Sequence, residues 1–281
     1  MKKQKIIGFF LLATLLMSCI CGGGSPTVAP TPTPTTKKLL LIFNGESNSG
    51  GQVLNTLATP TELAVRPQVQ ILNNTSLLYE DLDIGTNNTI GHFGIGCCTM
   101  HGWELEVANQ VVANPSTYTD TLFLIKTGQG GSTIDQWKVN CGAYCDTNDN
   151  WIGNFYRRVN ASRTLFLRSD IIPVIFLSIG VNDLLQNTRN DTFQNKLYRH
   201  INTLRAITRQ TTPVILTKFN GTNTRYNNAL DSVANNMGLP KVYTIEATDV
   251  PLSDAWHWNY SGMKTMANRF LDVISNNRIN W

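Results

Sequence analysis

Charged residues are scarce in this chain, and it lacks basic tracts. Asp, Glu, Lys and Arg make up only 15% of the 281 residues and hydrophobic residues 42%. This balance excludes a disordered chain and a coiled coil. The net charge of +4 is spread over the whole length, without a run of basic residues interleaved with aromatics. We therefore expect no nucleic-acid partner, and the charge is expected to serve solubility.

Long apolar runs are also missing, and the one at the N-terminus is typical of an export signal. Lys2, Lys3 and Lys5 precede an apolar run from Ile6 to Met17. This run is too short for a stable transmembrane helix, which needs about 20 residues. No later run approaches that length. We expect residues 1–18 to be a signal peptide.

The end of this run resembles the lipidation signal of bacterial lipoproteins. Leu16, Ser18 and Cys19 fit the signal, in which a cysteine thiol accepts a diacylglycerol before cleavage. Residues 19–36 are rich in Gly, Pro and Thr and lack apolar periodicity, so we expect a semi-extended tether. The predicted location is the membrane, through a lipid anchor at Cys19, at the cell surface or in the periplasm. Ordinary cleavage and secretion is the alternative.

Four further cysteines form two tight clusters, Cys97 with Cys98 and Cys141 with Cys145. Export makes disulfides possible. Pairing between the clusters and pairing within each cluster both remain open. The second cluster could also suggest a metal site, but no Cys/His pair of zinc-finger spacing accompanies it, so we expect no metal.

Short apolar runs predict a parallel sheet. Runs that are apolar throughout, rather than alternating, suit strands buried on both faces. Five of them recur: Lys38–Phe43, Thr121–Thr127, Ile172–Ile179, Pro213–Phe219 and Lys241–Glu246. Segments with helical spacing lie between them, which predicts a three-layer α/β/α sandwich around a five-stranded parallel sheet, residues 37–281. The turn-rich stretch from Asn48 to Asn109 is expected to be an extended loop.

Four of these strands are followed by residues that can carry chemistry. Functional groups gather at the carboxyl ends of strands in such sheets. The first strand leads to Ser47 on a tight turn, and the second leads to Gly131, where a backbone N–H can approach a ligand. The third leads to Asn182, whose amide can donate to an oxyanion. After the fifth, Asp254 lies three residues before His257, a spacing that lets a carboxylate orient an imidazole. Each residue alone also fits a turn, a cap or a surface position, but together they indicate nucleophilic catalysis.

This order of residues resembles the SGNH, or GDSL-type, hydrolase superfamily. The matching blocks are Gly45-Glu46-Ser47, Gly180 to Asp183 and Asp254 to His257, and we choose Gly131 over Gly130 for the remaining block. Gly-Glu-Ser-Asn together with the segment 130–137 is most similar to sialate O-acetylesterase-like carbohydrate esterases. The resemblance implies a flavodoxin-like fold and a serine esterase that removes O-acetyl groups from carbohydrate without a cofactor.

The resemblance also implies the role of each site residue. Ser47 would be the nucleophile, His257 its general base, and Asp254 the carboxylate that orients His257. The backbone amides of Ser47 and Gly131 and the side chain of Asn182 would form the oxyanion hole. A lipolytic or thioester hydrolase of the same superfamily is one alternative, and a non-catalytic, carbohydrate-binding surface lipoprotein is another.

Other histidines and tryptophans could contribute to the site. His101 could line it, whereas His200 lies between apolar positions of a helix and is expected to be solvated. Trp137, Trp256 and Trp258 could stack on sugar rings, and the alternative for each is packing in the core or a loop.

Overall fold

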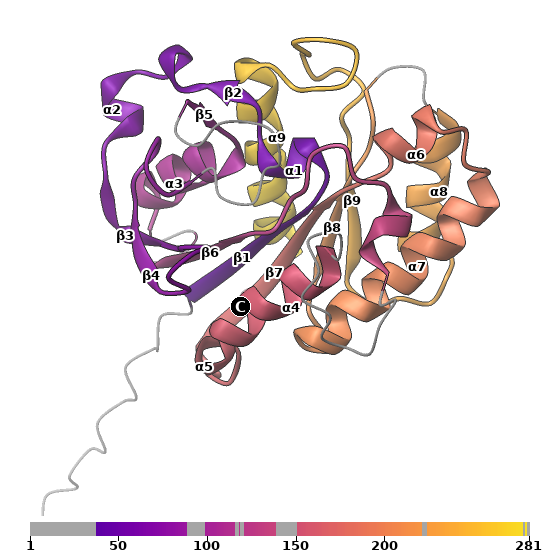
Figure 1. Ribbon diagram of the computed structural model, residues 1–281, viewed down its shortest axis with the longest axis horizontal. Coiled ribbons are helices and arrows are strands. Elements are labelled where there is room, and N and C mark those ends of the chain that lie inside the picture. The colour runs from indigo at the N-terminus through magenta and orange to yellow at the C-terminus, as the bar shows by residue number, and fades with distance from the viewer. Residues whose placement is uncertain are drawn as a thin grey trace, which may run out of the picture. The chain divides into compact units, whose positions relative to one another are not determined.

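A seven-stranded sheet lies at the centre of the described residues, in the order β4-β3-β6-β1-β7-β8-β9 (Figure 1). The computed structural model describes residues 38–88, 99–115, 118, 121–138, 151–220, 224–277 and 279. The predicted signal segment, the tether with Cys19 and the other cysteines lie outside these ranges. The predicted domain bounds, lipid anchor and disulfides therefore stay predictions.

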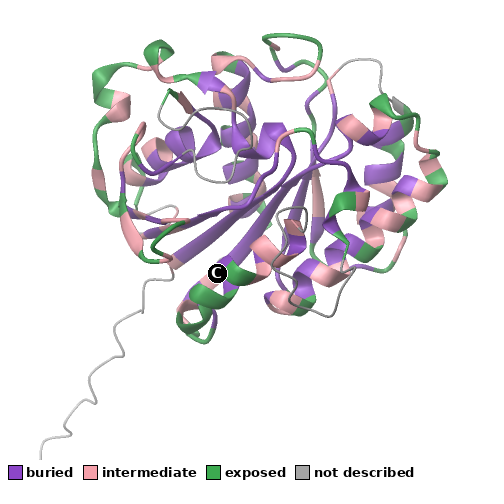
Figure 2. Cartoon of the chain, viewed as in Figure 1, coloured by how far each residue is buried: buried purple, intermediate pink, exposed green. Residues whose placement is uncertain are grey.

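The five predicted strands are all present and run parallel to their neighbours. They are β1 (Lys38–Gly45), β6 (Leu122–Lys126), β7 (Ile171–Ser178), β8 (Val214–Thr217) and β9 (Val242–Ile245). In β1, every residue from Leu39 to Phe43 is almost fully buried, as expected for a strand covered on both faces (Figure 2).

The predicted strand number is too small, because the stretch from Asn48 to Asn109 is not simply a loop. It contains β3 (Arg66–Leu72), parallel to β6, and the antiparallel edge strand β4 (Tyr79–Leu82). Only part of each strand is buried, and polar residues interrupt the apolar ones in both. Neither strand therefore has the continuous apolar run that revealed the other five.

The same stretch holds several short elements and one longer helix. The short elements are β2 (Val53–Leu54), η1 (Asn55–Leu57), α2 (Pro60–Leu63) and β5 (Met100–His101), and β2 pairs with β5. The longer helix is α3 (Trp103–Ala113), where Trp103, Val107 and Val111 show the helical spacing visible in the sequence.

Helices cover both faces of the sheet, which confirms the predicted α/β/α sandwich (Figure 1). One face packs against α3 and α9 (Tyr260–Asn276). The other packs against η2 (Ile134–Trp137), α4 (Trp151–Ala161), α5 (Arg163–Phe166), α7 (Asn190–Ile207) and α8 (Thr224–Asn235). The short helices α1 (Ser47–Gly50) and α6 (Val181–Leu185) follow the carboxyl ends of β1 and β7.

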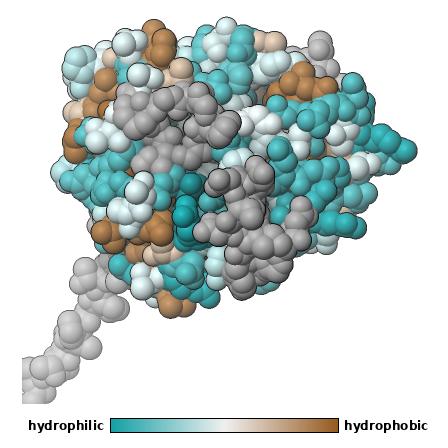
Figure 3. All heavy atoms as spheres, viewed as in Figure 1, coloured by the Kyte–Doolittle hydropathy of each residue, from teal (hydrophilic) through white to brown (hydrophobic). Residues whose placement is uncertain are grey.

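On the face that Figure 3 shows, apolar side chains form small separate patches among hydrophilic ones. The large apolar side chains that are exposed among the described residues are Leu54, Leu57, Val65, Leu78, Leu167 and Leu185. None of the helices in the described part of the chain is both long and apolar enough to cross a bilayer.

Candidate active site

The turn after β1 places Ser47 at the carboxyl edge of the sheet. Gly45 has a φ of +120°, and any Cβ there would overlap the carbonyl group of Ser178, so a side chain cannot be accommodated. The amide of Glu46 donates to the same carbonyl oxygen at 2.7 Å. Ser47 then opens α1, where the first amides of a helix have no partner within the helix. The strand–turn–helix geometry thus presents both the hydroxyl and the amide of Ser47.

The structure brings Ser47, His257 and Asp254 together in one hydrogen-bonded series. His257 Nε2 lies 2.9 Å from Ser47 Oγ, and His257 Nδ1 lies 2.7 Å from Asp254 Oδ2. A carboxylate at Nδ1 fixes the proton on that nitrogen, which leaves Nε2 as the acceptor for the serine hydroxyl. The arrangement can therefore remove a proton from Ser47 as it attacks a carbonyl carbon.

Asp254 is held in its ionised form by the loop around it. Partial burial raises its pKa, but hydrogen bonds from the His257 imidazole and from backbone amides outweigh this, and the net pKa lies below the usual range. Asp254 Oδ1 accepts from the amides of Trp256 at 2.7 Å and His257 at 2.8 Å. A carboxylate fixed in this way can stabilise an imidazolium at His257.

Asn182 links the other predicted site segments. Its side-chain Nδ2 donates to Glu46 Oε2 at 3.0 Å and to the carbonyl oxygen of Ser132 at 3.1 Å. Ser132 follows Gly131, whose φ is +74° and whose amide has no acceptor among the described residues. The amide of Asn182 therefore connects the turns that follow β1, β6 and β7.

Two buried carboxyl groups support these turns. Burial raises the pKa of Glu46 to about 8, although hydrogen bonds from Asn182 oppose the shift. Burial likewise raises the pKa of Asp183 to about 6, and its Oδ2 accepts from the amide of Ile134 at 2.9 Å. Both groups brace backbone rather than face the Ser47 hydroxyl.

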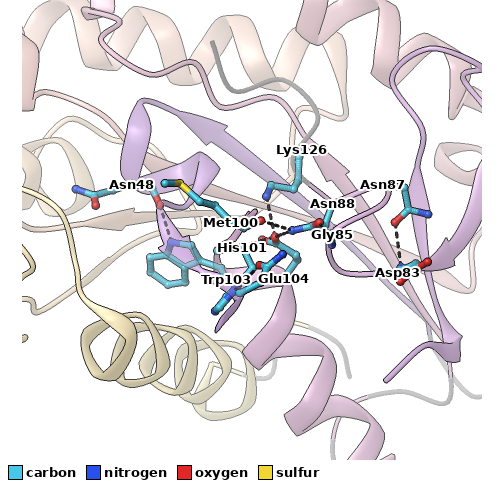
Figure 4. A network of polar contacts seen from close by, with 12 residues as sticks. Asn48, Asp83, Gly85, Asn87, Asn88, Met100, His101, Trp103, Glu104 and Lys126 are labelled. Atoms are coloured by element: carbon cyan, nitrogen blue, oxygen red, sulfur yellow. Dashed lines mark hydrogen bonds and ion pairs between the residues drawn. The ribbon is translucent and has the colours of Figure 1, made fainter. Parts of the chain in front are cut away.

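A second polar network centres on Glu104 and is shown in Figure 4. Glu104 Oε1 forms an ion pair with Lys126 Nζ at 2.9 Å, and it accepts hydrogen bonds from Asn88 Nδ2 at 2.9 Å and from the amide of Gly102 at 3.0 Å. Glu104 and Lys126 are both buried. The network joins the end of β6 to the start of α3, where Gly102 lies against Gly50 and Gly51 at the end of α1.

The prediction that His200 is solvated is wrong. It is only 5% exposed, and its Nε2 lies 3.2 Å from Asn44 Oδ1 at the end of β1. Burial lowers its pKa to about 3, so it stays neutral. The signal was available in the sequence, because position 200 lies three residues after Leu197 and four before Leu204, on the buried face of α7.

The tryptophans and His101 divide between core and surface. Trp137 and Trp258 are each 3% exposed and pack in the core, while Trp256 is partly exposed. His101 is buried, with Nδ1 3.0 Å from Asn55 Oδ1 and its ring edge-on to that of Tyr260. The contacts of His101 are therefore with Asn55 and with Tyr260 at the start of α9, and not with the His257 imidazole.

Metal ligands do not gather in the described residues, where no group of three or more His, Cys, Asp or Glu side chains could hold an ion. The chemistry that the site offers is that of a serine, an imidazole and a carboxylate.

The profile of one protein family, described as "carbohydrate esterase, sialic acid-specific acetylesterase", matches residues 37–276. The chain belongs to this family. It is a carboxylic ester hydrolase of the carbohydrate acetylesterase type, and the resemblance expected from the sequence is confirmed.

Solved structures with the same fold have little sequence in common with this esterase. A protein from Arabidopsis thaliana is 18% identical with a TM-score of 0.64, and the match covers 86% of this chain and 99% of that one. NanS is 12% identical with a TM-score of 0.61, over 86% and 98% of the two chains. A carbohydrate acetylesterase from Xanthomonas citri is 10% identical with a TM-score of 0.55, over 86% and 57%. Among curated protein sequences no significant match to the esterase is found.

Proposed function

We propose that this esterase removes O-acetyl groups from carbohydrate by a two-step transfer through Ser47. The observation that carries the proposal is the series from Asp254 through His257 to Ser47, with separations of 2.7 and 2.9 Å. Nucleophile, base and orienting carboxylate within hydrogen-bond reach are the signature of covalent acyl transfer. The family supports carbohydrate as the carrier of the acyl group.

In the first step, Ser47 Oγ attacks the acetyl carbonyl carbon while His257 Nε2 takes the hydroxyl proton. The carbonyl oxygen gains negative charge, which the amides of Ser47 and Gly131 would stabilise. Collapse of the resulting tetrahedral intermediate breaks the bond between the acetyl carbon and the sugar oxygen, and His257 gives the proton to that oxygen. In the second step, a water attacks the acetyl-serine with His257 again as base, which releases acetate and restores Ser47.

Asn182 would be the third donor to the oxyanion. Because both hydrogens of its Nδ2 already have acceptors, one of those bonds must be exchanged for a bond to the oxyanion. Glu46 Oε2 also accepts from the backbone amide of Asn182 at 3.4 Å, so Glu46 holds this residue by two contacts and the carbonyl of Ser132 by one. We therefore propose that substrate takes the place of Ser132 while Glu46 keeps Asn182 in position.

The test is release of acetate from O-acetylated glycans and of nitrophenol from nitrophenyl esters of short and long acids. The wild-type protein is compared with Ser47→Ala and with Ser49→Ala, which makes the same change two residues later on α1. We expect turnover of acetyl esters by wild type and Ser49→Ala and none above background by Ser47→Ala. A preference for long chains would favour the lipolytic alternative. Equal rates for wild type and Ser47→Ala would refute the proposed mechanism and favour a carbohydrate-binding role.

We also propose that the protein is exported and anchored to a membrane through a diacylglycerol on Cys19, with residues 19–36 as the tether. Replacement of Cys19 by Ala should then move the protein from the membrane fraction to the soluble fraction. Membrane association that persists in this variant would contradict the proposed anchor.

A further inference from the structure

Asn48 connects the helix that carries Ser47 to the loop that carries His257. Its Nδ2 donates to the carbonyl oxygen of Trp256 at 2.9 Å, and its Oδ1 accepts from the amide of Trp258 at 3.4 Å. Trp256 and Trp258 are the two chain neighbours of His257. One side-chain amide thus holds the backbone on both sides of the proposed base, from the position next to the proposed nucleophile.

The backbone of Asn48 is itself held in place by a buried side chain. Asn48 is 5% exposed, and its backbone carbonyl accepts from the indole Nε1 of Trp103 at 2.7 Å, at the start of α3 (Figure 4). The indole of Trp103 is fully buried and packs against the indole of Trp258 and the ring of Phe176. The bonds from Asn48 to the His257 loop therefore start from a rigid point of the core.

The loop needs such a connection, because its functional side chains are not held by burial. The side chain of His257 is 24% exposed and that of Asp254 is 53% exposed. Bonds such as those from the amides of Ser253 to the His257 carbonyl and of Asn259 to the Pro251 carbonyl join the loop only to itself. They shape the loop without setting its distance from α1.

We infer that Asn48 is a positioning residue, whose amide sets the separation between Ser47 Oγ and His257 Nε2. The inference rests on the proposed function. Loss of the amide would leave the loop attached through the buried Trp258 indole but no longer tied to α1 at Trp256, so that Ser47 and His257 could move apart. A displacement of about 1 Å in an active site can cost about 100-fold in rate. Binding of the substrate does not depend on this distance, so KM should change little.

The experiment compares Asn48→Ala with Asn227→Ala, a matched change elsewhere. Asn227 lies on α8, is 6% exposed, and bonds one backbone amide and one backbone carbonyl, both of Phe219, at 2.7 and 3.0 Å. Full-length variants are assayed for nitrophenyl acetate hydrolysis, for the rate at which a phosphonate ester modifies Ser47, and for thermal unfolding. We expect similar losses of thermal stability in the two variants. Only Asn48→Ala should lose about 100-fold in kcat and in the modification rate, with KM nearly unchanged.

A second variant keeps the test decisive if Asn48→Ala does not fold. Asn48→Asp preserves the size of the side chain and an acceptor for Trp258, but it cannot donate to Trp256, so the same loss in kcat is expected. A kcat that stays within a few-fold of wild type in the folded variant, or that falls equally in Asn227→Ala, would overturn the inference. Ser47→Ala is assayed beside them, because retained activity there would overturn the proposed function instead.

Discussion

Glu46 accepts the side-chain amide of Asn182 at 3.0 Å, although the two residues lie 136 positions apart. Glu46 follows β1 and directly precedes Ser47, and Asn182 follows β7, which pairs with β1 in the sheet. The bond fixes the orientation of the Asn182 amide relative to the turn that presents Ser47. Since the Glu46 carboxyl is fully buried, its protonation state should affect the stability of the whole turn.

Unfolding of the protein should respond to the ionisation of Glu46. Burial raises its pKa in the folded state to about 8 from an ordinary value of 4.5. Between these values the folded state holds a proton that the unfolded state releases. Stability from this group is therefore complete below pH 4.5 and is lost as the pH rises through 8, by at most about 1.4 kcal/mol per pH unit.

Urea unfolding of wild type and Glu46→Gln at pH 5 and pH 8 measures this effect. The wild type should lose more free energy of unfolding between the two pH values than Glu46→Gln, which cannot ionise. Asp183 titrates in the same direction in both proteins, so the difference between the two proteins reports Glu46. Equal losses in both would show that Glu46 is ionised at both pH values.

Gly131 offers a test of the oxyanion hole with a control in the same chain. Gly131 and Gly238 have φ values of +74° and +70°, and a Cβ at either position would meet no atom within 4 Å. Alanine should therefore cost each position about 1–2 kcal/mol through backbone strain alone. We expect only Gly131→Ala to lose kcat for nitrophenyl acetate, by about 10-fold or more, because relief of the strain turns its amide away from the oxyanion. Equal kcat values in the two variants would argue against the amide of Gly131 as a donor.

The buried pair of Glu104 and Lys126 should show strong coupling. Replacing Glu104 by Leu leaves the Lys126 ammonium buried without its partner, which should cost about 3–5 kcal/mol of unfolding free energy. Adding Lys126→Met should recover much of this loss, because no buried charge then remains. Urea unfolding of the single and double variants gives the coupling energy. Additive losses would mean that the two side chains act independently.

The strands that the sequence predicts are those whose own residues are apolar throughout, as expected for strands buried on both faces. Continuous apolar runs such as Leu39–Phe43 need no knowledge of their neighbours to be recognised. The strand β3 and the edge strand β4 owe their conformation to pairing, β3 with β6 and β4 with β3, and their mixed burial leaves no continuous apolar run. His200 was misjudged because a polar residue type outweighed its position on the buried face of α7.

The site could be predicted residue by residue but not as a set of contacts. Residue type and position after strands point to Ser47, Asp254 and His257, and the structure brings these residues within hydrogen-bond distance of one another. The contacts of Asn48 follow no such pattern, since its partners are backbone atoms 208 and 210 positions away. Backbone partners leave no trace in residue types, so only the folded structure reveals this connection.

Covalent trapping identifies the nucleophile, which we propose to be Ser47. The full-length protein is incubated with a phosphonate nitrophenyl ester, and the modified peptide is located by mass spectrometry. We predict one adduct per chain, on Ser47, that is absent from Ser47→Ala and forms far more slowly in His257→Ala. An adduct on another residue, or an unmodified Ser47 in a protein that hydrolyses acetyl esters, would contradict the account.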